Sequence, residues 1–422
     1  MWQFKWPWLG VAIPSLLISG IGTGSLFFVF RHHMTSEGQL AYFGLMVAVG
    51  FSYFLAVVTS PGKPPKDYKP QKNQWKVWCN KCNLYKPPRT HHCKQCQTCV
   101  LAMDHHCPWT NNCVGHGNMP HFMRFLFWVL GGTGYTFYLL SLRALEFYED
   151  RDLPAYLVDR SELAAVIILL LVDGFVFFAI SILALRCVFH IASGKTQIEV
   201  WEMERIEAQF HTERLWYQIR KNYKEVHGEE LPELTSWNIS ARYYDGDPLE
   251  VDEDVPLREL GQEAEEAEAS LIPEAFTPDD VIFPYDLGFF KNFVNALGYP
   301  WSFILFWGSP RGNGYEFECN DDDDQLNLPW PPDGGSTDFV AREYTDDELR
   351  ELGNPTLIKK HLDPRSRMPR SEWTNDMGET LQDFGVDVDG EDDLQLEKGS
   401  IGDCEEESEA GNTINAAEVG RT

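Results

Sequence analysis

The sequence predicts an α-helical multi-pass membrane protein with a cytosolic zinc-binding loop domain and a partly disordered acidic tail. Three observations predict this fold class: four long apolar segments, a cysteine-rich loop between the second and third of them, and a largely acidic second half. Averages over all 422 residues, including a formal net charge of -29, hide this division of the chain.

The four apolar segments span about residues 8–30, 40–58, 122–142 and 163–189. A hydrocarbon core of about 30 Å requires about 20 helical residues, so each segment can cross a bilayer. The first segment is too long for the apolar core of a signal peptide and lacks an obvious cleavage site, so we expect a retained anchor. Four such segments favour membrane helices over buried helices of a soluble domain.

Charge predicts the orientation of these helices. The loop between the second and third segments is rich in lysine and arginine, whereas acidic residues outnumber basic ones in the loop after the third segment. Short loops rich in lysine and arginine stay cytosolic. We therefore expect the cysteine-rich loop and both chain termini on the cytosolic side.

The loop holds most of the ten cysteines of the chain, namely Cys79, Cys82, Cys93, Cys96, Cys99, Cys107 and Cys113. Disulfides seldom persist in the cytosol, and two CxxC pairs with paired histidines are a strong zinc signal. Structural zinc is tetrahedral, so two ions need eight ligands. Seven cysteines and one histidine satisfy that number, and so do six cysteines and two histidines.

The second ligand set leaves one cysteine free for chemistry. Cys107 has His105 two residues before it, Asp104 adjacent to orient that imidazole, and no CxxC partner. A reactive thiol needs a nearby base. The sequence therefore predicts Cys107 as an uncoordinated nucleophile.

The stretch "MDHHCPWTNNCVG" in a cysteine-rich loop between membrane segments resembles the DHHC family of protein S-acyltransferases, or palmitoyltransferases. The resemblance covers about residues 78–122 and includes Asn118. Downstream, "YDLGFFKNFVNALG" is similar to the aromatic C-terminal motif of the family, with Asn292 and Gly298 at matching positions. "PHFMRF" and the acidic tail most resemble the fungal, endoplasmic-reticulum branch of the family.

The resemblance implies two structural zinc ions, the first held by Cys79, Cys82, His92 and Cys99, and the second by Cys93, Cys96, His106 and Cys113. It implies ping-pong transfer of a long-chain acyl group from palmitoyl-CoA, or another acyl-CoA, to cysteines of protein substrates. Cys107 would attack the thioester, with His105 as base and Asp104 orienting it. Lys86, Arg89 and His91 are candidate counterions for the CoA phosphates, although a solvated basic face or contact with lipid headgroups explains them nearly as well.

Two motifs depart from the family pattern. Ser60, Pro61 and Gly62 stand where the family usually has Asp-Pro-Gly, and "TQIE" has Gln197 at the second position of the usual Thr-Thr-x-Glu. Both departures flank the catalytic loop and leave its own residues unchanged. The two departures leave open whether the flanking segments pack as they do in other members of the family.

After the fourth segment, residues 196–226 predict an amphipathic helix that lies on the membrane face or packs on a small cytosolic domain. The apolar stretch 285–308 is expected to dock against the membrane helices. The acidic segments at 249–269 and from about 375 onward predict disorder. Asp173, within the fourth apolar segment, is expected to face the helix interior or a polar partner.

These features divide the chain into two membrane helices (1–62), the zinc domain (63–121), two further helices (122–190), a cytosolic C-terminal region (191–310) and an acidic, mostly disordered tail (311–422). The expected location is the endoplasmic-reticulum membrane. The expected partners are the lipid bilayer and membrane or peripheral proteins with juxtamembrane cysteines. The net charge of -29 argues against nucleic acid as a partner.

The alternative function is a membrane-tethered zinc module for protein binding or ubiquitin transfer. Such a module would use interleaved cysteine and histidine ligands, but it would not need a free cysteine beside His105 and Asp104. A channel or transporter would need more polar residues in its helices than Arg124, Asp173 and Arg186 provide.

Overall fold

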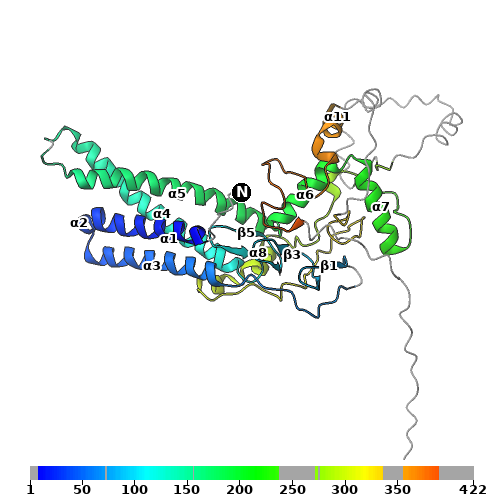
Figure 1. The fold of residues 1–422 in the computed structure, drawn as a ribbon. Helices are drawn as coiled ribbons and strands as arrows, with labels where there is room; N and C mark the ends of the chain where they lie inside the picture. Colours follow the sequence, from blue (N-terminus) through cyan, green and yellow to red (C-terminus); the bar gives the residue numbers. More distant parts are fainter. Residues whose placement is uncertain are drawn as a thin grey trace, which may run out of the picture.

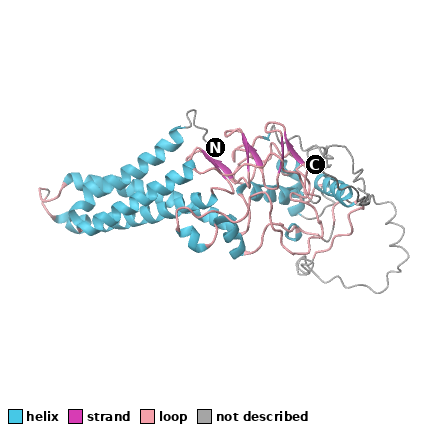
Figure 2. Cartoon of the chain, turned by 90° about the horizontal axis from the view of Figure 1, so that it is seen from below, coloured by secondary structure: helices cyan, strands magenta, loops and turns pink. Residues whose placement is uncertain are grey.

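The computed structural model describes residues 8–71, 74–154, 156–236, 271–273, 276–335 and 355–388. Long helices form a bundle at one end of the molecule, and three two-stranded hairpins follow the bundle in a row (Figures 1 and 2). The C-terminal helices and loops pack around these hairpins. The stretch 104–107 therefore lies at the junction between the bundle and the rest of the chain.

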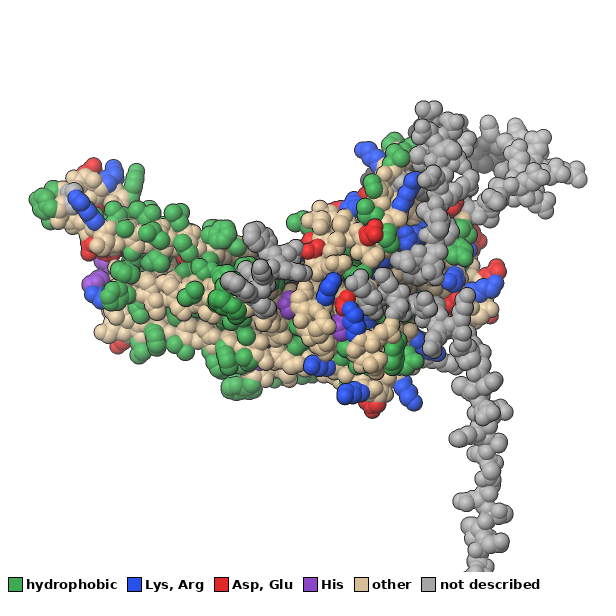
Figure 3. Space-filling view, in the orientation of Figure 1, with side chains coloured by type: hydrophobic (Ala, Val, Ile, Leu, Met, Phe, Trp, Pro, Cys, Tyr) green, Lys and Arg blue, Asp and Glu red, His purple; other side chains and the backbone are tan. Residues whose placement is uncertain are grey.

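The four predicted membrane helices are confirmed. They comprise α1 (Trp8–Ser25), which continues through a π-helical turn (Leu26–Phe30) into α2 (Arg31–His33), and then α3 (Ser36–Val58), α4 (Met119–Glu149) and α5 (Arg160–Ala192). Each has the length and apolar composition to cross a membrane. Apolar side chains cover much of the bundle surface seen in Figure 3, whereas lysine, arginine and acidic residues gather toward the other end.

Side-chain caps start two of these helices. Thr35 accepts a hydrogen bond from the backbone N–H of Gly38 before α3, and Asp159 accepts from those of Ser161 and Glu162 before α5. Within α5, Asp173 is fully buried, so the expectation that it faces the bundle interior is confirmed. The bundle thus encloses its costly polar group instead of presenting it to lipid.

The zinc domain consists of three antiparallel hairpins. They are β1 (Val77–Cys79) with β2 (Leu84–Lys86), β3 (His91–Cys93) with β4 (Thr98–Val100), and β5 (His105–Cys107) with β6 (Asn112–Val114). Each turn contains a residue with positive φ: Asn83, Gln97 and Asn111. Asparagine tolerates this left-handed conformation better than most residues, which suits it to two of the three turns.

Two helices, α6 (Gln197–Gln209) and α7 (Glu213–His227), replace the single helix predicted after α5. Trp201 and Trp216 are fully buried in them, and Ile206 and Ile219 are nearly so. Of the two alternatives, packing on a small domain outside the membrane helices is therefore the one observed. The chain turns between the helices at Thr212, whose hydroxyl caps α7.

The remaining elements among the described residues are short: 3-10 turns (Asp150–Asp152, Pro278–Asp280 and Pro364–Arg367) and the helices α8 (Phe289–Leu297), α9 (Pro300–Ile304) and α11 (Pro355–Leu362). The predicted docking of the aromatic segment is confirmed, because α8 contacts α4 and α5 and α9 contacts α4. Asn292 donates a hydrogen bond of 2.8 Å to the carbonyl of Ala192 at the end of α5. Arg124 of α4 donates to the carbonyl of Phe303 at 2.7 Å.

The structure corrects the expected start of the disordered tail. Residues 375–388 follow a defined path, and Leu381, Phe384 and Val386 are buried in it. The apolar residues scattered through this acidic stretch pack against the zinc domain, which composition alone does not show. The acidic segment at 249–269 and residues 389–422 lie outside the described residues.

Candidate active site and zinc centres

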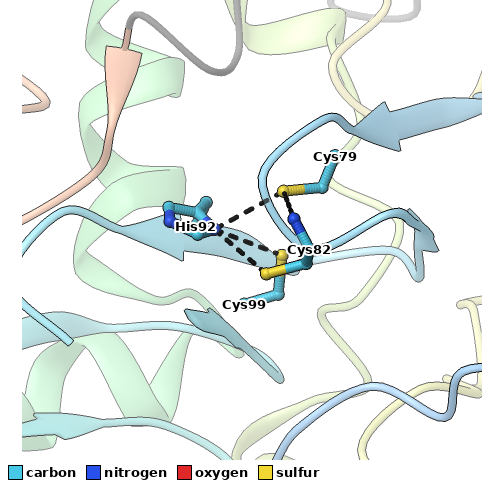
Figure 4. A group of neighbouring side chains, drawn as sticks. All are labelled: Cys79, Cys82, His92 and Cys99. Atoms are coloured by element: carbon cyan, nitrogen blue, oxygen red, sulfur yellow. Dashed lines mark hydrogen bonds between the residues drawn. The ribbon is translucent and has the colours of Figure 1, made fainter. Parts of the chain in front are cut away.

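Eight cysteine and histidine side chains form two compact groups that bridge neighbouring hairpins. The first group is Cys79, Cys82, His92 and Cys99, and the second is Cys93, Cys96, His106 and Cys113. Both match the sets that the resemblance implied. In each group the CxxC pair comes from one hairpin and the histidine and last cysteine come from the next, so the two groups link all three hairpins in series (Figure 4 shows the first).

The spacing of these atoms fits tetrahedral zinc. In the first group, Nδ1 of His92 lies 3.4, 3.3 and 3.7 Å from the sulfurs of Cys79, Cys82 and Cys99. In the second, Nδ1 of His106 lies 3.4 to 3.6 Å from the corresponding sulfurs. Zinc–sulfur bonds of about 2.3 Å and zinc–nitrogen bonds of about 2.0 Å at tetrahedral angles require about 3.5 Å between these atoms.

The third hairpin repeats the pattern without completing a metal site. Cys79, Cys93 and Cys107 follow one another at intervals of 14 residues and end the first strand of each hairpin. Thr110 stands where the first two hairpins have Cys82 and Cys96. Cys107 belongs to neither group of metal-binding side chains found among the described residues.

Asp104, His105 and Cys107 form a buried hydrogen-bonded series. Nδ1 of His105 lies 2.7 Å from Oδ2 of Asp104, which leaves Nε2 for the Cys107 thiol. The ring of Phe122 meets that of His105 edge-on with centroids 5.6 Å apart. The imidazole is therefore fixed by a carboxylate at one nitrogen and by an aromatic contact at the ring.

Burial disfavours the charged forms of His105 and Cys107, but their hydrogen-bond and charge partners favour these forms more strongly. Burial disfavours protonated His105, yet hydrogen bonds and charge interactions with Asp104 and Cys107 raise its pKa to about 10. Burial likewise disfavours the thiolate, yet His105 and Thr110 lower the pKa of Cys107. The arrangement favours a thiolate and imidazolium pair, which is the activated form of a cysteine nucleophile.

Cys107 lies at one end of the helix bundle. It belongs to an apolar cluster with Tyr53 of α3, Phe122 and Phe125 of α4, and Leu297 of α8. The Tyr53 hydroxyl donates a hydrogen bond of 2.7 Å to the carbonyl of Trp109 and so holds the third hairpin to α3. A thiol placed here can meet an acyl chain that is buried among helices or lipid.

Comparison with known proteins identifies the family. The sequence model of the DHHC palmitoyltransferase family matches residues 72–204. A protein named palmitoyltransferase PFA4 from Debaryomyces hansenii is 51% identical over 398 residues, which cover 92% of this chain and 96% of the relative. Proteins of the same name from Candida albicans and Saccharomyces cerevisiae are 42% and 38% identical, each over 92% of this chain and 99% of the relative.

The chain belongs to the DHHC palmitoyltransferase family. It is thus a multi-pass membrane protein S-acyltransferase, and the alternative of a zinc module without acyl transfer is not favoured. The expected kinship with a fungal branch of the family is confirmed by the fungal relatives.

The altered Thr-Thr-x-Glu motif of this DHHC protein keeps its contacts with the zinc domain. The backbone N–H of Gln197 donates a hydrogen bond of 2.9 Å to Oδ1 of Asp104. Glu199 binds Arg89 through two hydrogen bonds of 2.6 Å and also caps α6 together with Thr196. Because position 197 contributes its backbone, glutamine serves there as well as threonine for this contact.

The altered Asp-Pro-Gly motif also acts through its backbone. The carbonyls of Pro61 and Gly62 accept hydrogen bonds from the N–H groups of Gly117 and Leu101. A β-carbon at Gly117 would lie 2.7 Å from the carbonyl oxygen of Ser60, so the two segments can approach only because residue 117 has no side chain. The end of α3 is thereby fastened to the zinc domain.

The predicted CoA contacts Lys86, Arg89 and His91 line one cavity of about 740 Å³ in this DHHC protein. The Arg89 guanidinium is already bound to Glu199 and stacks on the rings of Tyr285 and Phe317 at 4.8 and 5.0 Å. Arg89 therefore has a structural partner that sequence analysis did not find. Asp322 and Glu202 also line the cavity, so its walls are of mixed charge.

Sequence reasoning missed several residues that shape the site. Thr110 and Tyr53 hold the hairpin that contains Cys107, and Gln197 supports Asp104. The interval of 14 residues between hairpins is a signal that could have found Thr110, because it places this residue at a vacant ligand position. No local signal marks Tyr53 or the backbone of Gln197, whose contacts depend on the tertiary fold.

Proposed function

We propose that Cys107 is the acyl-accepting nucleophile, that His105 transfers its proton, and that Asp104 orients His105. The hydrogen-bonded series of Asp104, His105 and a cysteine outside both zinc groups carries this proposal. The donor is palmitoyl-CoA or another long-chain acyl-CoA. The acceptors are cysteines of membrane or peripheral proteins close to the bilayer.

In the first half-reaction, His105 takes the proton of the Cys107 thiol. The thiolate attacks the carbonyl carbon of the acyl-CoA thioester, and the bond between that carbon and the CoA sulfur breaks. The departing CoA thiolate takes the proton from His105. The products are a thioester on Cys107 and free CoA thiol.

In the second half-reaction, the thiol of the protein substrate gives its proton to His105 and attacks the thioester carbonyl on Cys107. The bond to the Cys107 sulfur breaks, and Cys107 recovers a proton from His105. One thioester replaces another, so no oxidant or energy source is consumed. Asp104 keeps Nδ1 of His105 engaged throughout, so Nε2 remains the nitrogen that exchanges the proton.

We propose that the two metal groups hold Zn²⁺ with a structural role. Bound zinc supplies cross-links between the three short hairpins. Each group has four protein ligands, which leaves no open position for a substrate. The hairpin strands have only three residues each, so coordination provides much of their folding free energy.

We propose that the CoA end of the donor uses Lys86 and His91, whereas Arg89 acts mainly by holding α6 to the zinc domain. The bidentate bond between Arg89 and Glu199 supports this division. Replacing His91 by glutamine should raise KM for acyl-CoA with little change in kcat. An unchanged KM would remove His91 from the donor site.

We propose that the membrane is that of the endoplasmic reticulum and that both termini are cytosolic. The start of α1 and the zinc domain lie at the same end of the bundle, and the carbonyl of Val11 accepts a hydrogen bond from Tyr53 (Figure 1). Glycosylation acceptor sites inserted after residue 152 and before residue 8 test this topology. Only the first should be modified.

The predicted boundaries at 62, 121 and 190 stay our proposal for the membrane and zinc regions. For the C-terminal region we propose that the packed part extends to residue 388 instead of 310, because buried residues occur as far as Val388. Limited proteolysis tests this boundary. Peptide bonds between residues 355 and 388 should resist cleavage.

Metal and acyl chemistry can be separated by one pair of variants. Cys107→Ser should retain two zinc ions per chain and lose acyl transfer, because residue 107 is not a ligand. Cys113→Ser should lose zinc as well as acyl transfer, because Cys113 belongs to the second metal group. Zinc loss in Cys107→Ser would place that sulfur in a metal site and contradict the proposed mechanism.

A further inference from the structure

A segment near the described C-terminal end of the chain lies directly on the two zinc groups. The backbone N–H of Lys94 donates to the carbonyl of Gly385, that of His106 to Phe384, and that of Asp387 to His92, at 2.8 to 2.9 Å. Val386 forms an isolated antiparallel bridge with Cys93. These contacts reach both zinc-ligand histidines from a segment 278 to 295 residues further along the chain.

Apolar packing fastens the same segment. Leu381, Phe384 and Val386 belong to one buried cluster with Val100 and Met103 of the zinc domain. Trp373 meets Trp201 of α6 edge-on with ring centroids 4.9 Å apart, and Nε1 of Trp201 donates to the carbonyl of Glu379. We refer to residues 379–388 as the clasp. The clasp is thus anchored to α6 as well as to the hairpins.

Asp387 brings a carboxylate to the first zinc group. Its side chain is fully buried and bonds to the ammonium of Lys81 through Oδ2. The same oxygen lies 4.0 Å from Nε2 of His92, whose Nδ1 faces the three cysteine sulfurs. At 4.0 Å this is a charge contact and not a hydrogen bond, and a carboxylate on this side of a metal-bound imidazole helps to orient the ring and favours its coordination.

Gly385 brings the clasp backbone to the second zinc group. Its φ is +88°, and a β-carbon there would lie 2.5 Å from Cβ of His106. Gly378, just before the clasp, has a similar φ of +73° but no atom within 4 Å of the same construction. Alanine at either position meets similar backbone strain, but only at 385 does it press on a zinc ligand.

We propose that the clasp is part of the zinc domain and that Asp387 is a positioning residue for His92 in the first metal group. The proposal rests on zinc occupying the two groups, as proposed above, and it does not depend on Cys107 chemistry. The acidic chain beyond the membrane helices therefore contains a segment that keeps the metal in the enzyme.

Zinc release from the purified full chain, in excess chelator, tests the proposal. A metal indicator follows the release of each of the two ions. The test variant Asp387→Asn is compared with the control Asp376→Asn. Asp376 lies shortly before the clasp, and its side chain is 86% exposed. Asp387→Asn should release one of its two ions about 10- to 100-fold faster and leave the other at the wild-type rate. Asp376→Asn should match wild type.

Several outcomes would overturn the role of Asp387. Wild-type release from Asp387→Asn would show that the carboxylate does not support the metal. Equal acceleration of both ions would show general loosening instead of support for His92. A wild-type chain that binds no zinc would instead contradict the proposal that the two groups hold zinc. Failure of the zinc proposal is thus distinguishable from failure of the role of Asp387.

The glycine pair tests the clasp independently. Gly385→Ala should accelerate release of the ion held by His106, whereas Gly378→Ala should behave as wild type. Substituting Co²⁺ for zinc shows whether the ligands of the accelerated ion have changed, because the absorption bands of Co²⁺ depend on its ligands and their geometry. Equal release from the two glycine variants would contradict a direct contact between the clasp and the second group.

Discussion

The backbone N–H of Gln197 donates a hydrogen bond of 2.9 Å to Oδ1 of Asp104, while Oδ2 of the same carboxylate binds His105. The first residue of α6 thus supports the proposed catalytic series of Asp104, His105 and Cys107 from a different part of the chain. The positive end of a helix suits a buried carboxylate, because its first N–H groups have no partner within the helix.

This contact predicts the effect of proline at position 197. Proline is well tolerated at the first position of a helix, and it removes only the N–H that binds Asp104. Gln197→Pro should slow acylation of Cys107 by about 10- to 100-fold, since a hydrogen bond to a charged group contributes about 1.5–3 kcal/mol. Gln197→Ala, which keeps the N–H, should remain near wild type in the same rate measurement. Equal loss in both would implicate the glutamine side chain instead.

The raised pKa of His105 predicts an alkaline limit of activity. Its folded-state pKa of about 10 exceeds the ordinary value of 6.5, so the stabilisation from the charged pair is complete below 6.5 and is lost as pH rises through about 10. The imidazolium that protonates the departing CoA disappears over the same range. Acylation should therefore persist at neutral pH and fall near pH 10.

Asp104→Asn provides the matched test of this limit. Asparagine removes the charge that raises the pKa of His105. In this variant the acylation rate should be lower, and its decline at high pH should begin at a lower pH. Initial acylation rates across pH, with tryptophan fluorescence as a check on folding, measure the shift. A limit that stays near pH 10 in the variant would exclude His105 as the group that titrates.

Removing one zinc ligand should unfold the hairpins. Structural zinc contributes about 10–16 kcal/mol of binding free energy, which is comparable to the total stability of a domain. Cys93→Ser should lose metal and make residues 74–118 sensitive to protease. Cys319→Ser, which replaces an exposed cysteine, is the control and should keep both properties. A protease-resistant Cys93→Ser zinc domain would show that coordination is not what holds the hairpins.

Arg89 and Glu199 form a buried ion pair between the zinc domain and α6, with side chains 12% and 4% exposed. Removing one partner of such a pair costs about 3–5 kcal/mol, because the other charge stays buried. Arg89→Ala should therefore lower thermal stability and acyl transfer together, and Arg89→Lys should only partly restore them. A variant of normal stability with a raised KM for acyl-CoA would instead make Arg89 a donor contact.

The sequence predicts the membrane helices and the metal groups well because both leave local signals. Long apolar runs mark α1, α3, α4 and α5, and regularly spaced cysteines and histidines mark the ligands. The free state of Cys107 follows from its neighbours His105 and Asp104. These are properties of short stretches, which need no knowledge of tertiary contacts.

What the sequence does not predict depends on distant pairs of residues. Asp387 is one acidic residue among many in the tail, and only the fold places it 4.0 Å from His92. The clasp residues Leu381, Phe384 and Val386 are too sparse to outweigh an acidic composition that predicts disorder. The sequence favours a phosphate contact for Arg89, because its partner Glu199 lies 110 residues away and leaves no local signal.

The most direct test of the central claim is acylation of the purified protein itself. After incubation with labelled palmitoyl-CoA, the wild-type chain should carry a hydroxylamine-sensitive label that maps to Cys107. Cys107→Ala should retain both zinc ions and carry none. Equal labelling of the two proteins, or a label mapped to another cysteine, would contradict Cys107 as the acyl-enzyme nucleophile.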